Sequence, residues 1–313
     1  MSGAALLAPA LLLAVGSGYS AMLGLGRYGG MAGIPPLAFS FGHVGGGAVA
    51  LLVLCALRRR LPPLDRRHLR FYVIAGTLGS ALPMGLMFVL VHQLGASLTG
   101  LLFPLSPIIT YAIAIGGRIE PFDRVRAAGI GLGVIGAALI VLPRAALPAT
   151  IDPVWMLIGL LLPASLAFGN VYRSWDWPAG TDGTTLVTGV LIASSATLLP
   201  LILATDQFYL PLPPRSGADL ALAGITLVSG VYFVLFFELQ RIGGGVYISQ
   251  LSHVIAICSL AIGYLAFDER LSAWVWAAVV VVAAGVLLVN SRRRVVDARP
   301  PSRVRTEDAD QRH

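Results

Sequence analysis

Long apolar stretches alternate with short polar or charged clusters along almost the whole chain. A helix that crosses the ~30 Å hydrocarbon core of a bilayer needs about 20 mostly apolar residues. Marking each apolar stretch of this length predicts ten membrane-spanning helices. The predicted spans are residues 5–25, 33–57, 70–91, 96–116, 125–143, 153–173, 184–205, 217–237, 245–267 and 272–290.

Composition agrees with a membrane protein. The chain has 313 residues, of which 57% are hydrophobic and 12% charged, and its mean hydropathy is +0.82. A typical soluble domain carries roughly 25% charged residues. Helices satisfy their own backbone hydrogen bonds in hydrocarbon, whereas open sheets cannot. The sequence therefore predicts an all-α integral membrane protein, with any chemistry inside the bilayer or at its surface.

The two ends of the chain differ in character. The N-terminal apolar run has no basic residues before it and continues to about Leu25, so we interpret it as the first span rather than a cleaved signal peptide. Residues 292–313 are highly charged and lack apolar periodicity, which predicts a disordered cytoplasmic tail. Attraction to anionic lipid and a solvated orientation signal are both open for this tail.

Arginine placement predicts the orientation. All 22 basic residues are arginine, and the net charge is +7. With the N-terminus in the cytoplasm, the positive-inside rule is obeyed by ten spans with both termini cytoplasmic. We expect a bacterial inner membrane, because arginine without lysine is typical of a GC-rich bacterium. Orientation accounts for the basic charge, so no nucleic-acid partner is predicted. The arginines left outside are Arg27, Arg144, Arg215 and Arg270.

Cofactor and metal chemistry has no sequence signal. Cys55 and Cys258 lie inside apolar runs and form no CxxC spacing, so we predict neither a disulfide nor a metal site. A GxxxxGK[ST] loop for ATP is absent from the sequence, which argues against a primary pump. The prediction is a protein without a cofactor and without a catalytic group.

The chain contains an internal repeat. A shift of 146 residues places LSPIITYAIAIGGRIEPFDR (105–124) on LSHVIAICSLAIGYLAFDER (251–270). In both copies an apolar helix ends in an acid–arginine pair, Asp123-Arg124 or Glu269-Arg270, and a second apolar helix follows. A unit of five helices is odd, so the second copy enters the membrane the opposite way up. We predict two inverted five-helix repeats, residues 1–145 and 146–291.

These two segments resemble the closing two-helix signature of each half of the drug/metabolite transporter (DMT) superfamily, EamA-like family. That signature has Ser-Pro in an apolar helix, a short acid–Arg turn and a Gly/Ala-rich helix. The resemblance implies the EamA/DMT fold and transport of small metabolites such as amino acids. Two positions depart from the signature: His253 stands where it has proline, and Phe122-Asp123-Arg124 stands where Gly-Glu-Arg is usual.

Two symmetry-related helices carry small or polar stripes. Gly245, Ser249, Ser252, His253 and Ala256 share one helical face. One hypothesis is that this stripe and its counterpart line a central cavity between the halves; the other is that small and hydroxylated residues only let helices pack closely. The counterparts in the first half are Thr99, Phe103, Ser106, Pro107 and Thr110.

Helix-packing signals occur elsewhere. Gly16-Ser20-Gly24, Gly42-Gly46 and Gly129-Gly133-Ala137 have the small-xxx-small spacing of close helix contacts, and we expect them in the core. Prolines interrupt the apolar runs at membrane depth and free backbone carbonyls. These prolines are Pro83, Pro104, Pro107 and Pro163.

Only His43 and His253 place an ionisable ring near the predicted midplane. Such groups are costly in a membrane and are candidates for function, although a neutral histidine bonded to a neighbouring helix is equally consistent with the sequence. Protons are therefore a candidate coupling ion. The predicted substrate-binding residues are His253, His43, Ser252, Ser249, Ser106, Thr110, Tyr111, Tyr247, Tyr232 and Tyr19.

The leading hypothesis is a secondary transporter that exports a small-molecule substrate by alternating access within the lipid bilayer. The alternatives are an intramembrane lipid-modifying enzyme and a non-transporting membrane scaffold. An enzyme would need acids, histidines or arginines converging at one depth. The predicted positions of these residues are scattered, which favours the transporter.

Overall fold

The computed structural model describes the backbone of residues 3–117, 122–141, 152–178, 180–210, 213–214 and 216–291. Side chains are described in these ranges except at 3–6, 8, 140–141, 153, 174, 237, 240–250 and 290–291. The predicted disordered tail, residues 292–313, lies outside the described residues.

Every regular element in the described ranges is a helix. The elements are α1 (Gly3–Met31), α2 (Pro36–Leu57), α3 (Arg66–Gly76), the π-helical η1 (Thr77–Ala81), α4 (Leu82–Leu102), α5 (Leu105–Gly116), α6 (Arg124–Val141), α7 (Pro153–Gly159), α8 (Leu161–Trp175), α9 (Gly183–Ala204), α10 (Gly217–Phe267) and α11 (Ala273–Ser291).

Each predicted span coincides with helical residues, and several spans are built from more than one element. The third span runs through α3, η1 and the first part of α4, and the fourth through the rest of α4 and α5. Proline accounts for several of these breaks, because its nitrogen cannot donate to the carbonyl four residues earlier. Pro83 follows η1, Pro104 separates α4 from α5, and Pro163 follows the junction of α7 and α8.

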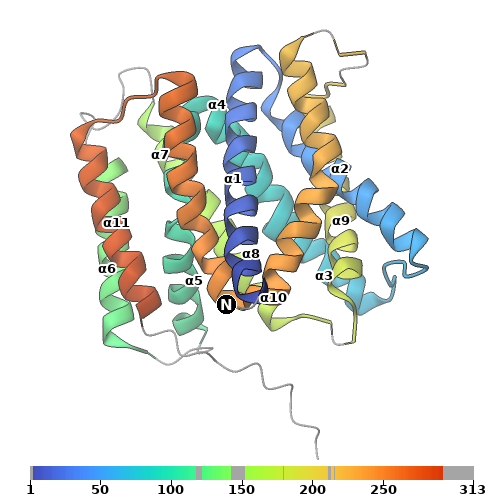
Figure 1. Cartoon of the computed structure of the whole chain (residues 1–313), viewed down its shortest axis with the longest axis horizontal. Coiled ribbons are helices and arrows are strands. Elements are labelled where there is room, and N and C mark those ends of the chain that lie inside the picture. Colours follow the sequence, from blue (N-terminus) through green and yellow to red (C-terminus); the bar gives the residue numbers. More distant parts are fainter. Residues whose placement is uncertain are drawn as a thin grey trace, which may run out of the picture.

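Helix α10 covers two predicted spans. A straight helix of its 51 residues would be about 75 Å long at 1.5 Å per residue, more than twice the ~30 Å hydrocarbon core. Figure 1 shows that the golden and orange parts of α10 diverge from the lower end of the molecule and run toward its upper end. The two apolar portions are Gly217–Phe236 and Leu251–Phe267.

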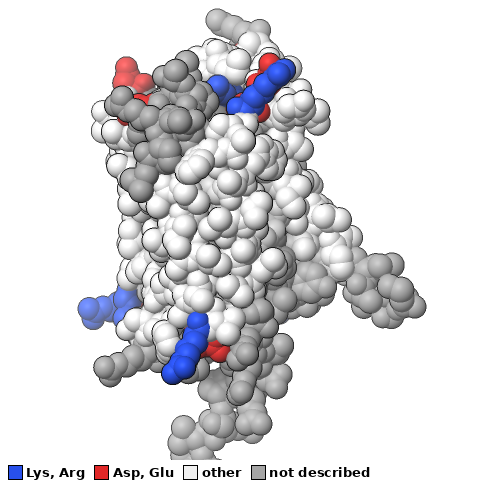
Figure 2. Space-filling model, turned by 90° about the vertical axis from the view of Figure 1, so that its left-hand side faces the viewer, with Lys and Arg blue, Asp and Glu red and all other residues white. Residues whose placement is uncertain are grey.

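Length and composition support membrane insertion. Six described segments are long and apolar enough to cross a bilayer, and further apolar helices are shorter. Figure 2 shows a broad band without charge on the visible face, with arginine and acidic side chains at both ends. The six segments are Pro9–Met31, Pro36–Leu57, Arg66–Leu102, Val154–Arg173, Gly183–Ala204 and Gly217–Phe236; the shorter helices include Leu105–Gly116, Leu251–Phe267 and Ala273–Val289.

The two halves are inverted relative to each other. Helix α6 begins at the lower end of Figure 1, directly after Asp123, whereas α11 begins at the upper end, shortly after Glu269. The two acid–arginine pairs therefore mark opposite ends of the bundle. The predicted all-α membrane fold with two inverted five-helix repeats is confirmed. The division of the repeats at residue 145 stays a prediction.

Small residues hold the helices together, as their spacing predicts. Gly16 and Gly24 of α1 lie against Val254 and Ile262 of α10, and a Cβ at Gly16 would lie 2.5 Å from Val254 Cγ1. Between α6 and α11, a Cβ at Gly129 would lie 2.6 Å from the carbonyl oxygen of Gly285. Lipid offers apolar surface equal to that of a neighbouring helix, so close backbone approach is a main source of helix association.

Replacing Gly129 by leucine should therefore destabilise the pairing of α6 with α11. We expect Gly129→Leu to lower the free energy of unfolding by about 1–3 kcal/mol, the usual cost of overpacking. Thermal unfolding in detergent measures this. Gly131→Leu on the same helix is the matched control, because a Cβ at Gly131 meets no atom within 4 Å. Equal melting temperatures for the two variants would contradict the prediction.

Candidate functional site

Three of the predicted substrate-binding residues meet between the two halves. Tyr19 of α1, His43 of α2 and Tyr232 of α10 lie together, with ring centroids 5.9 Å apart for Tyr19 and Tyr232 and 5.5 Å apart for His43 and Tyr232. Phe103, at the junction of α4 and α5, packs edge-on against Tyr19 at 5.2 Å, and Phe233 stacks on His43 at 4.9 Å. We call these five residues the aromatic–histidine cluster.

Three members of the aromatic–histidine cluster, Tyr19, His43 and Phe103, are buried in this structure, and Tyr232 and Phe233 are half-buried. Tyr19 is 6% exposed and His43 is 1% exposed. The hydroxyl of Tyr19 reaches only the sulfur of Met84, at 3.6 Å. A solute can therefore reach the rings of Tyr19 and His43 only if the surrounding helices move apart.

Hydrogen bonds fix the tautomer of His43. Its Nδ1 lies 2.9 Å from Ser229 Oγ, and the Ser229 hydroxyl lies 2.5 Å from the carbonyl oxygen of Ile225. A serine hydroxyl has one hydrogen, and a carbonyl can only accept. Because the Ser229 hydrogen goes to Ile225, Nδ1 of a neutral His43 must donate to Ser229. The Nε2 atom is then a hydrogen-bond acceptor, and it is buried without a partner.

The other predicted residues on α5 lie elsewhere. Ser106 is buried. The Thr110 hydroxyl donates to the Ser106 carbonyl oxygen at 2.8 Å, a common hydrogen bond of serine and threonine inside helices. Tyr111 reaches the turn before α6: its hydroxyl oxygen accepts the Asp123 N–H at 3.1 Å, and the Arg126 guanidinium lies 3.5 Å from its ring centroid. Substrate contact by these three residues stays a prediction.

The predicted residues on α10 divide by position. Ser252 and His253 are half-buried, next to Leu251 and Val254, which contact Gly16 of α1. The side chains of Tyr247 and Ser249 lie outside the described residues. The role of the polar stripe of α10 in binding stays a prediction.

A helix break at one end of the bundle is closed by a carboxylate from the other half. Gly95 interrupts α4 with φ 85° and ψ 176°, a conformation that favours glycine. The break leaves the N–H groups of the next helical turn without partners in their own helix. Glu269 accepts the N–H of Ala96 at 2.9 Å and that of Ser97 at 2.8 Å. We call this arrangement the Glu269 clasp.

Arg27 completes the Glu269 clasp from α1. Its Nε lies 3.8 Å from Glu269 Oε1, and its Nη1 donates to the carbonyl oxygen of His92 at 2.9 Å. The Glu269 side chain is only 15% exposed. Gly263 cannot be replaced by a larger residue without displacing the Glu269 side chain, because a Cβ at Gly263 would lie 2.4 Å from Glu269 Oε2.

At the opposite end of the bundle an exposed ion pair joins the halves. Arg70 of α3 donates to Asp176, which follows α8, at 2.9 Å, and the two side chains are 61% and 19% exposed. The Tyr172 hydroxyl donates to the same carboxylate at 2.8 Å. The Tyr172 hydrogen bond, together with Arg70, lowers the pKa of Asp176 below its usual range.

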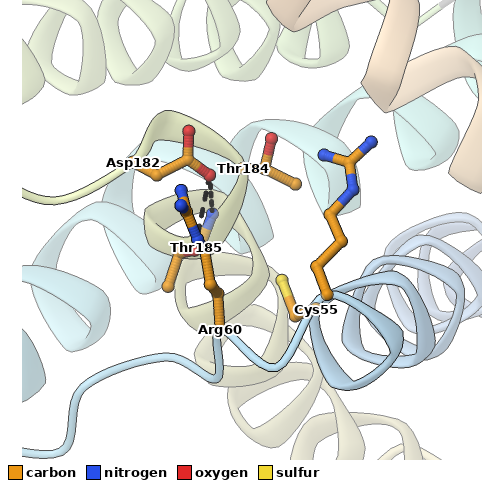
Figure 3. Close-up of a pocket in the computed structure, with 6 residues that line it drawn as sticks. Cys55, Arg60, Asp182, Thr184 and Thr185 are labelled. Carbon is orange, nitrogen blue, oxygen red and sulfur yellow. Dashed lines mark hydrogen bonds between the residues drawn. The ribbon is translucent and has the colours of Figure 1, made fainter.

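A pocket of about 340 Å³ opens at this same end, where α2 ends and α9 begins. Asp182 caps α9, accepting the N–H of Thr185 at 3.3 Å and its hydroxyl at 3.4 Å (Figure 3). None of the predicted substrate-binding residues lines this pocket. It is lined by Cys55, Arg58, Arg60, Asp182, Thr184 and Thr185.

Across the described part of the chain, no three His, Cys, Asp or Glu side chains gather into a group able to hold a metal ion. The polar groups of the aromatic–histidine cluster are instead imidazole and hydroxyl groups. Such groups can hydrogen-bond a solute.

Sequence reasoning missed Ser229, Phe233 and the capping role of Glu269. A signal for the first two was present, because Ser229, Tyr232, Phe233 and Phe236 share one face of α10 at i, i+3, i+4 and i+7. Glu269 was predicted only as a membrane boundary. Its partner Ala96 lies 173 positions away in the chain, and a glycine gives no sign in sequence that its φ is positive.

These features define a multi-pass helical membrane protein whose two inverted halves enclose a polar and aromatic centre. The sequence pattern of the EamA-like transporter family matches residues 5–142 and again residues 149–291. The chain belongs to the EamA-like transporter family, which confirms the resemblance to the drug/metabolite transporter superfamily. Its class is that of DMT-type transporters, which act on small molecules in a membrane.

Comparison with solved structures supports the fold and does not extend to the function. A solved structure described as "Crystal structure of protein" is similar over 93% of this chain and 98% of its own, with 18% identity and a TM-score of 0.59. No curated protein matches the chain.

Proposed function

We propose that this protein is a secondary transporter that exports small polar or amphipathic metabolites, amino acids or related compounds, by alternating access. The observation that carries this proposal is the aromatic–histidine cluster, buried where helices of both halves meet. Transporters built from inverted repeats bind their substrates at the repeat interface near the bilayer midplane.

The chemistry of the cluster favours a substrate with a hydrogen-bond donor and an apolar or cationic part. His43 Nε2 offers a buried acceptor, and amino or hydroxyl groups are suitable donors. The faces of Tyr19, Tyr232 and Phe103 can pack on an apolar side chain or attract an ammonium group. Amino acids and related metabolites combine these features.

Alternating access requires the ends of the bundle to open in turn. The Glu269 clasp ties the halves at one end, and the Arg70–Asp176 pair ties them at the other. With both ties made, Tyr19 and His43 of the cluster are buried. Breaking one tie while keeping the other gives the solute access from one side only.

An enzymatic role has less support. Asp123 and Glu269 lie at opposite ends of the bundle, and His43 lies among aromatic rings between the halves. A hydrolytic or transfer site needs such groups within reach of one another. We therefore propose transport without an enzymatic step.

We propose a bacterial inner membrane with both termini in the cytoplasm. The loop from Arg58 to Arg70 lies at the same end as the start of α6, which places much of the positive charge on one side. An excess of arginine at one end is the usual mark of the cytoplasmic face.

This orientation predicts the labelling of two single cysteines. Asp268→Cys, whose native side chain is 77% exposed, should react with a membrane-impermeant maleimide on intact cells. Phe122→Cys, 66% exposed at the other end, should react only after permeabilisation. Cys55 and Cys258 are replaced first. Reaction of both cysteines from the same side would overturn the inverted topology.

The substrate class is tested by flux. Purified protein in liposomes should exchange radiolabelled amino acids, and a panel that includes nucleosides and sugars reports the selectivity. Empty liposomes and liposomes that contain Gly129→Leu protein are the controls. Exchange of none of the amino acids would contradict the proposed substrate class.

His43 is tested by a matched pair of variants. In His43→Asn the amide can replace Nδ1 and keep the bond to Ser229, while the acceptor at Nε2 is lost. One hydrogen bond contributes about 0.5–1.5 kcal/mol, so the KM for a transported substrate should rise about 2- to 13-fold. His43→Gln places an amide oxygen near the Nε2 position and should transport better than His43→Asn. Wild-type KM values in both would refute a binding role.

A further inference from the structure

The pocket at the start of α9 lies between the two halves of the molecule. Its lining residues come from the end of α2 and the following connection, which belong to the first half, and from the start of α9, which belongs to the second. Its volume of about 340 Å³ falls within the usual range of small-molecule pockets, roughly 300–1,000 Å³. We call it the arginine pocket, because Arg58 and Arg60 line it.

The end of α2 determines which arginines reach the arginine pocket. Arg59 adopts the left-handed conformation with φ 52°, and the N–H of Arg60 bonds back to the Cys55 carbonyl oxygen at 2.9 Å. This is a common hydrogen-bond pattern at a helix C-terminus. The turn holds Arg60 against the helix end, and Figure 3 shows its side chain beside the first turn of α9. Arg58 also lines the pocket, whereas Arg59, between them, does not.

The protein does not neutralise the positive charge of the arginine pocket. Among the described residues, the side chains of Arg58 and Arg60 form neither an ion pair nor a hydrogen bond. Asp182 is the acidic residue of the lining, and its carboxylate already accepts the N–H and the hydroxyl of Thr185. Two arginines and one carboxylate leave a net positive charge, so the pocket attracts an anion.

The start of α9 adds hydrogen-bond donors to the arginine pocket. The first N–H groups of a helix have no acceptor within the helix and carry partial positive charge. Asp182 accepts the N–H of Thr185, while no described residue accepts those of Gly183 and Thr184. Thr184, which lines the pocket, also supplies a hydroxyl group. Guanidinium, backbone N–H and hydroxyl donors are the groups that bind the oxygens of a phosphate.

The surroundings of the arginine pocket favour a lipid as the source of the phosphate. The apolar segment Pro36–Leu57 ends directly before Arg58, which places the arginines at the level of the lipid headgroups. Leu57, Leu61 and Leu64 flank the arginines in the chain and are 78%, 60% and 75% exposed. Exposed leucines at a membrane boundary can pack against acyl chains. Basic pockets between transmembrane helices bind the headgroups of anionic lipids.

We propose that the arginine pocket binds the phosphate group of an anionic lipid, whose acyl chains lie along the exposed leucines. The phosphate accepts hydrogen bonds from Arg58, Arg60 and the first turn of α9, so it joins the two halves at the arginine-rich end. A ligand stabilises the arrangement that binds it, which here is the one with α2 against α9. The pocket is separate from the aromatic–histidine cluster, and the inference does not depend on the proposed transport function.

The inference is tested with three ligands on protein purified in a non-ionic detergent. Dioctanoyl phosphatidylglycerol carries the phosphate, dioctanoyl glycerol has the same acyl chains without it, and inorganic phosphate lacks the chains. The melting temperature at rising ligand concentration gives an apparent Kd. We expect phosphatidylglycerol to stabilise the wild type and dioctanoyl glycerol to have no effect. The apparent Kd should rise when NaCl is raised from about 50 to about 500 mM, because salt screens the attraction.

Three variants separate the arginine pocket from the general charge of the surface. Arg58→Gln and Arg60→Gln should each raise the apparent Kd for phosphatidylglycerol about fivefold, the usual effect of one basic residue at an anionic membrane surface. Arg59→Gln is the matched control, because it removes the same charge from the same connection but does not line the pocket. Its Kd should stay within about twofold of the wild type, since water and salt screen a charge outside the pocket. All three arginines are exposed, so the variants should fold.

Three results would overturn the proposal. Equal stabilisation by dioctanoyl glycerol would show that the acyl chains bind without the phosphate. Equal loss of affinity in Arg59→Gln and Arg60→Gln would assign the binding to the basic surface as a whole. Stabilisation by inorganic phosphate without stabilisation by phosphatidylglycerol would make the ligand a soluble phosphate. If a variant fails to fold, the salt dependence of the wild type and the comparison of ligands still decide. None of these measurements involves transport, so each result leaves the proposed function standing.

Discussion

The need to satisfy every backbone group in hydrocarbon shapes this molecule. A continuous helix meets that need by itself, and a broken one cannot. Two breaks in the first half are closed by side chains of the second. Glu269 accepts the N–H groups that Gly95 frees in α4, and Arg173 of α8 donates to the Gly79 carbonyl, at 3.2 Å, which Pro83 leaves without a partner.

These hydrogen bonds fix the relative position of the two halves more precisely than apolar packing alone could. Ser20 of α1 adds another, donating to the Ile255 carbonyl of α10 at 3.0 Å. When the halves move, each of these backbone groups must find a new partner or meet water. The alternating access that we propose would be a switch between bonded arrangements, with the hydrogen bonds as the points where a ligand can shift the equilibrium.

Much of the fold could be predicted from the sequence, because hydrophobic length alone determines which segments can span a bilayer. The inverted halves followed from a repeated acid–arginine pair after an apolar helix. Tyr19, His43 and Tyr232 could also be selected as candidate site residues from the sequence, since polar and aromatic groups are few in the apolar runs. The contacts of these residues could not be predicted, because they join positions far apart in the chain. His43 and its hydrogen-bond partner Ser229, for example, are separated by 186 positions.

The two midplane histidines show where sequence reasoning stops. Both stand alone in apolar runs, and nothing local distinguishes them. In the structure His43 is buried against two aromatic rings with its Nδ1 bonded to Ser229, whereas His253 is half-buried beside the contact of α1 with α10. Only the three-dimensional arrangement gives His43 a defined tautomer, and with it a buried acceptor at Nε2.

The ion pair at one end of the bundle and the Glu269 clasp at the other differ in their exposure to water. The Arg70–Asp176 pair is exposed to water, where an ion pair contributes about 0–1 kcal/mol. The Glu269 clasp is shielded and joins a carboxylate to two backbone N–H groups, which makes it the stronger tie while the carboxylate is ionised. At neutral pH the arginine-rich end should therefore open more readily. If that end faces the cytoplasm, the resting protein loads its solute from inside the cell, as an exporter must, and needs a further input to release it on the other side.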